Sequence, residues 1–167
     1  MERHALIIEH EACWGCRTCE LACKQEHDFA VKFIHVTEDG PKFVGDRLDF
    51  LYRVNVCQHC DDPPCAQACP EEAITKRPDS IVILDREKCI GCQACVEECP
   101  YDAIAFDEEN QKALKCNLCH HRVDRGLLPA CADNVCLAHC IYFGDPEQIH
   151  ATIMKKRQKR ADRSTLR

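Results

Sequence analysis

The chain has 167 residues, seventeen of which are cysteines, and its formal net charge is −6 at pH 7. Cysteine at about a tenth of the chain marks a scaffold held by disulfide or metal bonds. With six phenylalanines, three tyrosines and one tryptophan, the sequence has little material for an ordinary apolar core, and no stretch approaches the roughly 18 apolar residues that a membrane helix needs. We therefore expect no direct membrane span, and we expect the metal-free chain to lack a stable fold.

Disulfides are the alternative use of so many cysteines, and they are typical of secreted proteins. The beginning of the chain has only Ala5 to Ile8 as an apolar run, interrupted by Glu9, and it shows neither a signal-peptide core nor a twin-arginine pair. We therefore predict a cytoplasmic protein whose reduced thiols bind metal. A partner subunit that carried an export signal for both chains would leave no trace in this sequence.

The first predicted element is a short strand over His4–Glu9, which leads into the first group of cysteines. This group has the pattern CxxCxxCxxxC and consists of Cys13, Cys16, Cys19 and Cys23. The pattern is typical of an iron–sulfur cluster loop, although no proline follows its last cysteine.

The next segment, residues 25–49, contains no cysteine and includes the pair Gly40 and Pro41. Glycine and proline mark chain reversals, so this segment is predicted to be an inserted loop or hairpin. Its two histidines, His27 and His35, are expected at the surface.

Two further groups follow predicted strands over Tyr52–Val56 and Ser80–Asp85, and both end in Cys-Pro. The second group consists of Cys57, Cys60, Cys65 and Cys69. The third group consists of Cys89, Cys92, Cys95 and Cys99. The third group has the bacterial ferredoxin pattern for [4Fe-4S] ligation, in which three thiolates hold one cluster and the fourth binds the neighbouring cluster. The two groups therefore predict a pair of clusters.

The stretches that begin with these Cys-Pro pairs repeat each other. CPEEAITKRPDSIVIL and CPYDAIAFDEENQKAL each contain a turn after the proline, an Ala-Ile that opens a strand, a polar reversal and a returning strand. Such a repeat indicates a ferredoxin unit with pseudo-two-fold symmetry and crossed ligation. Cluster B is accordingly assigned to Cys57, Cys60, Cys65 and Cys99. Cluster C is assigned to Cys89, Cys92, Cys95 and Cys69.

The remaining cysteines form a looser fourth group, made up of Cys116, Cys119, Cys131, Cys136 and Cys140. We expect this group to pair with the first group in the same crossed way. Cluster D is then assigned to Cys116, Cys119, Cys131 and Cys23. Cluster A is assigned to Cys13, Cys16 and Cys19, with a fourth ligand from the last group. This scheme leaves one of the seventeen cysteines spare.

The predicted fold class is α+β, with two interleaved bacterial-ferredoxin-like units of short strands, short helices and cluster-binding loops. Residues 50–106 form the inner unit, and residues 1–24 plus 107–145 form the outer unit. Residues 146–167 form a basic C-terminal tail, expected as a solvated helix or as a segment that docks on the body or on an acidic partner. The tail lacks interleaved aromatics, so we expect no nucleic-acid partner.

Four stretches carry a resemblance to a known family. They are VNVCQHCDDPPCAQACP, EKCIGCQACVEECPYDAI, KCNLCHHRVDRGLLPAC and the closing FGD. In order, number and flanking residues they resemble the four-cluster iron–sulfur subunit of the dimethyl sulfoxide reductase family, from about Ala5 to Asp145. The resemblance implies two partners: a molybdenum- or tungsten-pterin catalytic subunit, and another redox protein or subunit. Similar small subunits accompany tungsten aldehyde oxidoreductase-type enzymes such as dearomatising aryl-CoA reductases.

The fourth group departs from the pattern of that family. Members usually have three residues between the last two ligands and a proline after the final one, whereas four residues separate Cys131 from Cys136 and Leu137 follows. The distance from Cys136 to the closing Phe-Gly-Asp fits the family, so Cys136 is assigned to cluster A and Cys140 is the spare cysteine. The alternative uses Cys136 and Cys140, which have the usual spacing. A third possibility is a zinc-bound or empty fourth site, which leaves three clusters.

The sequence contains no phosphate-binding glycine loop and no nucleophile elbow, so we expect no catalysis by the chain itself. The predicted function is the relay of single electrons through four [4Fe-4S] clusters, and the alternative is a stand-alone polyferredoxin. His59 and His120 are expected to hydrogen-bond or pack rather than to ligate iron. His121 and Arg122 are candidates for positive charge near a cluster.

Overall fold

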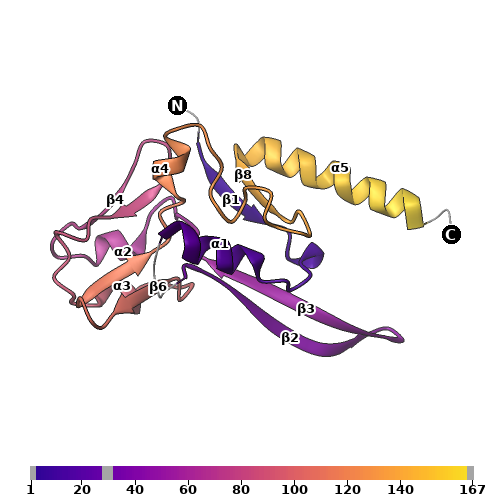
Figure 1. Ribbon diagram of the computed structural model, residues 1–167, viewed down its shortest axis with the longest axis horizontal. Coiled ribbons are helices and arrows are strands. Elements are labelled where there is room, and N and C mark those ends of the chain that lie inside the picture. Colours follow the sequence, from indigo (N-terminus) through magenta and orange to yellow (C-terminus); the bar gives the residue numbers. More distant parts are fainter. Residues whose placement is uncertain (1–2, 28–31, 165–167) are drawn as a thin grey trace.

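The computed structural model describes residues 3–27 and 32–164 (Figure 1). Parts of three predicted segments, residues 1–2, 28–31 and 165–167, lie outside the described residues. Within the described ranges the strands form four two-stranded antiparallel sheets. The pairs are β1 (Ala5–Ile8) with β8 (Ile141–Gly144), β2 (Ile34–Val44) with β3 (Arg47–Val56), β4 (Ile74–Lys76) with β5 (Val82–Leu84), and β6 (Ile104–Asp107) with β7 (Lys112–Lys115).

Helices alternate with these strands, so the protein has mixed helices and short antiparallel strands, in agreement with the predicted α+β class. The α-helices are α1 (Thr18–His27), α2 (Pro64–Gln67), α3 (Ala94–Glu97), α4 (His120–Val123) and α5 (Pro146–Ser164), and a 3-10 helix covers His10–Ala12. The short helices carry or adjoin the cysteine groups: α2 contains Cys65, α3 contains Cys95, and α4 begins directly after Cys119. Helix ends therefore present cysteines to their surroundings.

The predicted internal repeat is visible as two hairpins. After the second group β4 pairs with β5, and after the third group β6 pairs with β7, each opening at an Ala-Ile step as predicted. In Figure 1 both hairpins lie with α2 and α3 at one end of the molecule. This end is the part of the chain for which the inner ferredoxin-like unit was predicted.

The predicted N-terminal strand is present as β1, and its partner is β8, far along the chain. The register runs from Ala5 opposite Gly144 to Ile8 opposite Ile141. Because Cys13 follows β1 and Cys140 precedes β8, this pairing brings the first and fourth cysteine groups together. Local sequence pattern predicts such a strand but cannot identify its distant partner.

The β2–β3 hairpin is longer than the insertion predicted over residues 25–49. The strand predicted over Tyr52–Val56 is the end of its second arm, and the chain reverses at Gly45, whose φ of 63° favours glycine. The base of the hairpin is buried, whereas its tip exposes apolar side chains including Phe43. Figure 1 shows the hairpin extending away from α2 and α3.

Glu20 of α1 fastens the base of this hairpin. Its Oε1 accepts a hydrogen bond of 2.6 Å from the Val36 amide, and its Oε2 forms an ion pair with Lys32. Burial opposes ionisation of Glu20, but Lys32 and the Val36 amide outweigh burial and lower the pKa of the carboxyl. The adjoining Phe33 amide donates to Cys23 Sγ at 3.3 Å, so the hairpin base also contacts a cysteine.

The interior consists of two buried clusters in which cysteines are prominent. The larger cluster combines aliphatic side chains from the hairpin base and the fourth group with six cysteines: Cys19, Cys23, Cys116, Cys131, Cys136 and Cys140. The smaller cluster lies in the two repeated hairpins and contains Cys65, Cys89 and Cys95. Cysteine thiols thus occupy the positions that aliphatic and aromatic side chains fill in an ordinary core.

The C-terminal helix α5 packs on β8 and β1 and forms ion pairs with the body. The side chain of Glu9 is 1% exposed and accepts from Arg157 Nε at 3.1 Å and from Arg160 Nη1 at 3.4 Å. Of the two expectations for the tail, the described residues therefore show a docked helix. None of the helices in the described ranges is long and apolar enough to span a bilayer.

Candidate metal centres

The predicted ligands of cluster B line one cavity, which we call cavity B. Cys57, Cys60, Cys65 and Cys99 surround about 340 Å³ of space free of protein atoms, together with apolar side chains such as Val82 and Ile104. Three of these thiols come from the second group and one comes from the third. The structure therefore brings together the crossed set of cysteines, and not the four cysteines of a single motif.

A second cavity, cavity D, has the same character at the base of the β2–β3 hairpin. Its walls contain the four predicted ligands of cluster D: Cys23, Cys116, Cys119 and Cys131. The unfilled space is about 310 Å³, and Phe33, Ile34 and Leu118 complete its apolar walls. Here the thiol of Cys23, from the first group, joins three from the fourth.

The predicted ligands of cluster C lie within electrostatic reach of one another. Burial raises the pKa of Cys95 to about 11, and the neighbouring thiols of Cys89, Cys65, Cys69 and Cys92 raise it further. Backbone amides bond to the last cysteine of both Cys-Pro groups in the same way: Ala73 N donates to Cys69 Sγ at 3.3 Å, and Ala103 N donates to Cys99 Sγ at 3.4 Å. The repeat in sequence is thus also a repeat in the environment of the thiols.

The candidates for cluster A include both possible fourth ligands. Burial raises the pKa of Cys19 to about 12, with smaller contributions from Cys136 and Cys13. The sulfur atoms of Cys136 and Cys140 are 3.5 Å apart, and burial and the Cys136 thiol raise the pKa of Cys140. Both remain candidates because both lie beside the thiols of the first group.

The chemistry of these donor sets fits iron–sulfur clusters. A buried thiolate requires a compensating positive charge, which iron supplies, and several backbone amides point at sulfur atoms, as in Leu118 N to Cys116 Sγ at 3.4 Å. In the described part of the chain no three or more metal-binding side chains converge closely enough for a single ion. The thiols instead surround cavities, which is the arrangement that a multi-iron group needs.

Gly15 and Gly91 occupy the cysteine loops for a reason that differs from the expected one. The sequence suggests that a side chain there would block the approach of backbone amides to a cluster. In the structure both residues have positive φ, 69° and 75°, and an added Cβ would lie 2.3 Å from the Tyr52 ring and 2.4 Å from the Gln111 carbonyl oxygen. The crowding therefore comes from the protein itself, and it fixes the path of both loops.

His59 is buried beside cavity B and is hydrogen-bonded, in agreement with its predicted role. Its Nδ1 accepts a hydrogen bond of 2.9 Å from the Val82 amide. Burial, reinforced by the positive charges of Lys115 and Lys76, lowers the pKa of His59 to about 2. The imidazole is therefore neutral at physiological pH, with its proton on Nε2.

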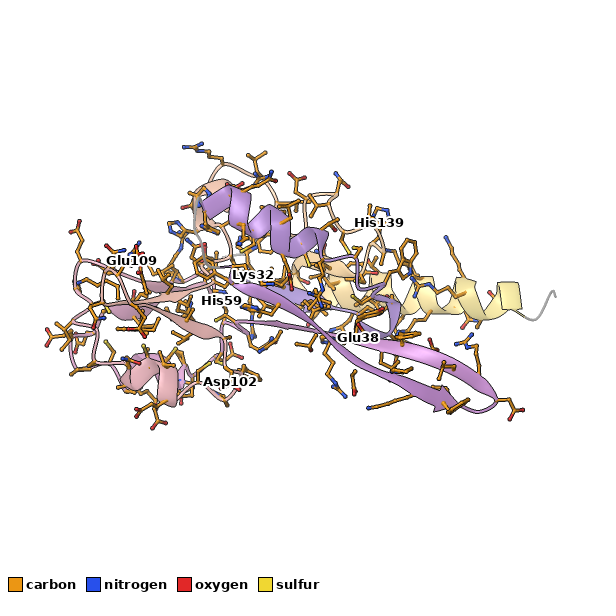
Figure 2. All side chains as sticks on the ribbon, turned by 60° about the horizontal axis from the view of Figure 1, so that its bottom comes forward. Lys32, Glu38, His59, Asp102, Glu109 and His139 are labelled. Carbon is orange, nitrogen blue, oxygen red and sulfur yellow. The ribbon has the colours of Figure 1, made fainter. Side chains whose placement is uncertain are left out.

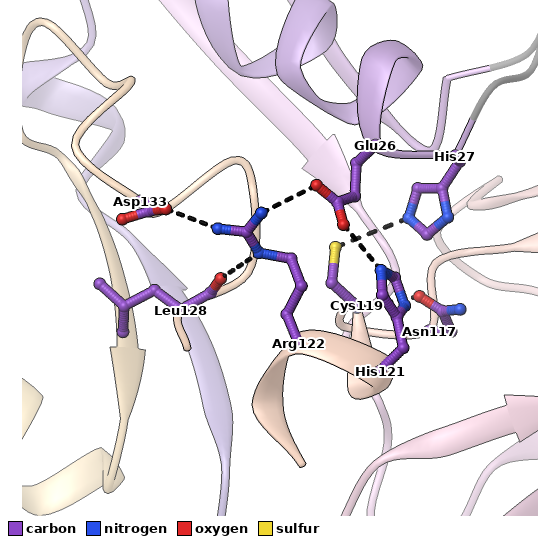
Figure 3. A network of polar contacts seen from close by, with 8 residues as sticks. All are labelled: Glu26, His27, Asn117, Cys119, His121, Arg122, Leu128 and Asp133. Atoms are coloured by element: carbon purple, nitrogen blue, oxygen red, sulfur yellow. Dashed lines mark hydrogen bonds and ion pairs between the residues drawn. The ribbon is translucent and has the colours of Figure 1, made fainter. Parts of the chain in front are cut away.

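The prediction that His27 lies at the surface is wrong. The ring is half-buried against the wall of cavity D, with Nε2 3.6 Å from Cys119 Sγ (Figure 3). One signal in the sequence could have located it: His27 follows Cys23 by four residues, which places both on the same face of helix α1. His35, in contrast, is exposed as predicted.

His121 and Arg122 were candidates for positive charge near a cluster, but both are paired with carboxylates. His121 Nε2 donates to Glu26 Oε1 at 2.7 Å, and Arg122 Nη1 donates to Glu26 Oε2 at 2.9 Å (Figure 3). Arg122 also contacts Asp133 at 2.5 Å. This network ties α4 to α1 across cavity D, and its internal pairing offsets the charge that the sequence suggested.

Comparisons with known proteins agree with this geometry. A family described as a 4Fe-4S dicluster domain matches residues 48–146. A tetrathionate reductase subunit of Salmonella typhimurium is 38% identical over 90% of this chain and 61% of its own length. A putative dimethyl sulfoxide reductase iron–sulfur subunit of Halobacterium salinarum is 34% identical over 93% and 71% of the two chains, and a component of the anaerobic dimethyl sulfoxide reductase of Escherichia coli is 34% identical over 88% and 76%. This chain thus spans less than two thirds of the tetrathionate reductase subunit. It belongs to the 4Fe-4S dicluster family, as an iron–sulfur subunit of the dimethyl sulfoxide reductase type.

Proposed function

We propose that this chain relays single electrons to or from a molybdenum- or tungsten-pterin catalytic subunit and performs no catalysis itself. The observation that carries the proposal is the presence of two apolar cavities, each walled by four cysteines from two crossed motifs. When bound there, [4Fe-4S] clusters supply one-electron redox chemistry, while the protein positions them and adjusts their potentials.

The proposed ligand sets are the four crossed sets assigned from the sequence, and they imply two interleaved ferredoxin-like units. Cys99 in cavity B and Cys23 in cavity D support the crossing. The pairing of β1 with β8 supports an outer unit that combines residues 1–24 with 107–145 around an inner unit of residues 50–106. Four clusters use sixteen of the seventeen cysteines.

Contacts between the cysteine groups support a linear order of clusters C, B, D and A. The thiol of Cys65 lies near that of Cys95, which connects the sites of B and C. Cys57 lies near Cys116, which connects B and D. Cys131 lies near Cys19, which connects D and A. Each site therefore adjoins the next, as a relay requires.

The two ends of this order reach the surface. Cys92 of the site for cluster C and Cys16 of the site for cluster A are exposed, whereas the cysteines of B and D are buried or half-buried. Trp14, beside Cys16, is 67% exposed. We infer that one end faces the catalytic subunit and the other end faces a second redox partner.

The choice between Cys136 and Cys140 leads to a prediction. We expect Cys140→Ala to retain the iron of the wild-type chain and Cys136→Ala to lose about four irons per chain, because Cys136 is the proposed ligand of cluster A. Iron analysis of the anaerobically purified variants measures the difference. The reverse pattern would make Cys140 the ligand, and loss of iron from neither variant would show that each can replace the other.

The proposed function is tested on chain purified anaerobically with whatever partner accompanies it. We expect roughly equal iron and acid-labile sulfide, molybdenum or tungsten in a large copurifying subunit, and magnetically coupled [4Fe-4S] signals in electron paramagnetic resonance. Zinc without sulfide would refute the proposal. Iron and sulfide in a chain that copurifies with no partner would favour the alternative of a stand-alone polyferredoxin.

A further inference from the structure

Lys115, the last residue of β7, is a buried lysine whose charge has no carboxylate partner. The residue is 4% exposed, and none of the ion pairs found across residues 3–27 and 32–164 includes it. Its Nζ donates to the Val82 carbonyl oxygen at 2.5 Å and to the Cys116 carbonyl oxygen at 2.7 Å. An ammonium group that is removed from water without a compensating negative charge is strongly unfavourable, so its position needs a reason.

The thiols around Lys115 supply that reason. Its charge acts on Cys60 and Cys65 in the wall of cavity B and on Cys116 in the wall of cavity D. Lys115 therefore lies where the two cavities approach each other. A cluster held by four thiolates has a net negative charge, and two such clusters would compensate the ammonium group from two sides.

His59 presents a second polar group to the same region. Because Nδ1 accepts the Val82 amide, Nε2 carries the proton, and this atom is buried without a hydrogen-bond partner in the described structure. His59 is 7% exposed and contributes to the wall of cavity B. Figure 2 shows the residue near the middle of the molecule, whereas Glu38 lies along the hairpin. An unsatisfied donor in this wall suits a sulfur acceptor inside the cavity.

We propose that Lys115 is a fixed positive charge that raises the redox potentials of clusters B and D, and that His59 donates a hydrogen bond from Nε2 to cluster B. The inference rests on the proposed function. One-electron reduction adds one negative charge to a cluster, so a nearby buried ammonium group stabilises the reduced form, and a hydrogen bond to sulfur acts in the same direction. Lys115 is thus a positioned charge for the relay and not a ligand.

A purely structural role is the competing explanation, because Lys115 also connects β5 to the end of β7 through two carbonyl groups. The two roles differ in what they require. A structural connection needs a donor of suitable length, whereas a redox role needs the charge. Substitutions that separate length, hydrogen bonding and charge therefore decide between them.

The experiment is a potentiometric titration of the anaerobically purified full-length chain, followed by electron paramagnetic resonance. In K115M we expect two midpoint potentials to fall, so that at a fixed applied potential the ratio of reduced to oxidised cluster decreases by at least about tenfold, or about 59 mV for a one-electron couple. K115R keeps the charge and should stay close to wild type. His59→Leu should lower only one of the two potentials.

The matched control is K42M, which removes the same charge from the exposed hairpin, where Lys42 pairs with Asp39 at 2.6 Å. Solvent screens that charge, so K42M should leave every potential unchanged. Full iron content in K115M with unchanged potentials overturns the inference, as do equal shifts in K115M and K42M. If K115M does not retain iron, K115Q replaces it, because glutamine keeps a hydrogen-bond donor without charge.

The remaining outcomes are also decisive. Loss of iron from both neutral variants, with retention in K115R, assigns Lys115 to cluster assembly and overturns the redox role. Iron and sulfide analysis of the wild-type chain separates the two levels of failure. A wild-type chain without sulfide refutes the proposed function, whereas sulfide-containing chain whose potentials do not respond to Lys115 refutes only this inference.

Discussion

Removal of iron from the anaerobically purified chain is expected to unfold it. Six cysteines occupy the larger buried cluster and three occupy the smaller one, so the interior is built around thiols that iron holds together. Without iron the cavities collapse or fill with water, and buried apolar area alone does not offset the conformational entropy of so short-stranded a protein. Near-ultraviolet circular dichroism should lose its signal, and the cooperative thermal transition should disappear.

A sample taken through the same steps without chelator is the control for this experiment. Iron together with sulfide should restore the circular dichroism signal, whereas iron alone or zinc alone should not, because the cavities require a group with several metals and bridging sulfur atoms. A chain that keeps a cooperative transition after complete removal of iron would contradict the prediction. That result would mean that the apolar contacts in the two buried clusters are sufficient for folding.

Crossed ligation gives the second large expected effect, and double variants test it. Cys60→Ala and Cys99→Ala should each remove about four irons, and the double variant C60A/C99A should lose no more than either single variant, because both thiols belong to cluster B. In contrast, C92A/C99A should lose about eight irons, because Cys92 belongs to cluster C. Iron analysis and the amplitude of the reduced paramagnetic signals measure the loss.

Ligation within each motif predicts the opposite pattern. C92A/C99A would then lose about four irons, and C60A/C99A would lose about eight. The two double variants have the same number and kind of substitutions, so each is the control for the other. Equal losses in both double variants would contradict crossed ligation and would indicate that the inner unit binds iron only as a whole.

Cysteine spacing predicted the ligand groups well because ferredoxin loops follow local rules. The distance between Cys89 and Cys92 allows both thiols to face one cluster, and the Ala-Ile steps after the Cys-Pro pairs mark where β4 and β6 begin. These features depend on neighbouring residues. The crossed pairs required the further step of reading the repeat as a symmetric unit.

Features that depend on distant contacts could not be obtained in this way. The sequence shows Tyr52–Val56 as a strand but does not show that it continues the hairpin arm that begins at Arg47. Arg122 is a charged residue in a cysteine motif, and only the fold shows that Glu26 neutralises it. Lys115 is similarly inconspicuous beside Cys116, because burial and the absence of a carboxylate partner among the described residues are properties of the assembled structure.

The pairing of β1 with β8 has a consequence for biosynthesis. Translation produces Ala5–Ile8 at the start of the chain, but the strand that pairs with it ends at Gly144, so the two can meet only when most of the chain has left the ribosome. Residues 50–106 emerge earlier and contain every cysteine proposed for clusters B and C. Cofactor insertion should therefore be possible at these two sites during synthesis, whereas the sites for A and D must wait for the final third of the polypeptide.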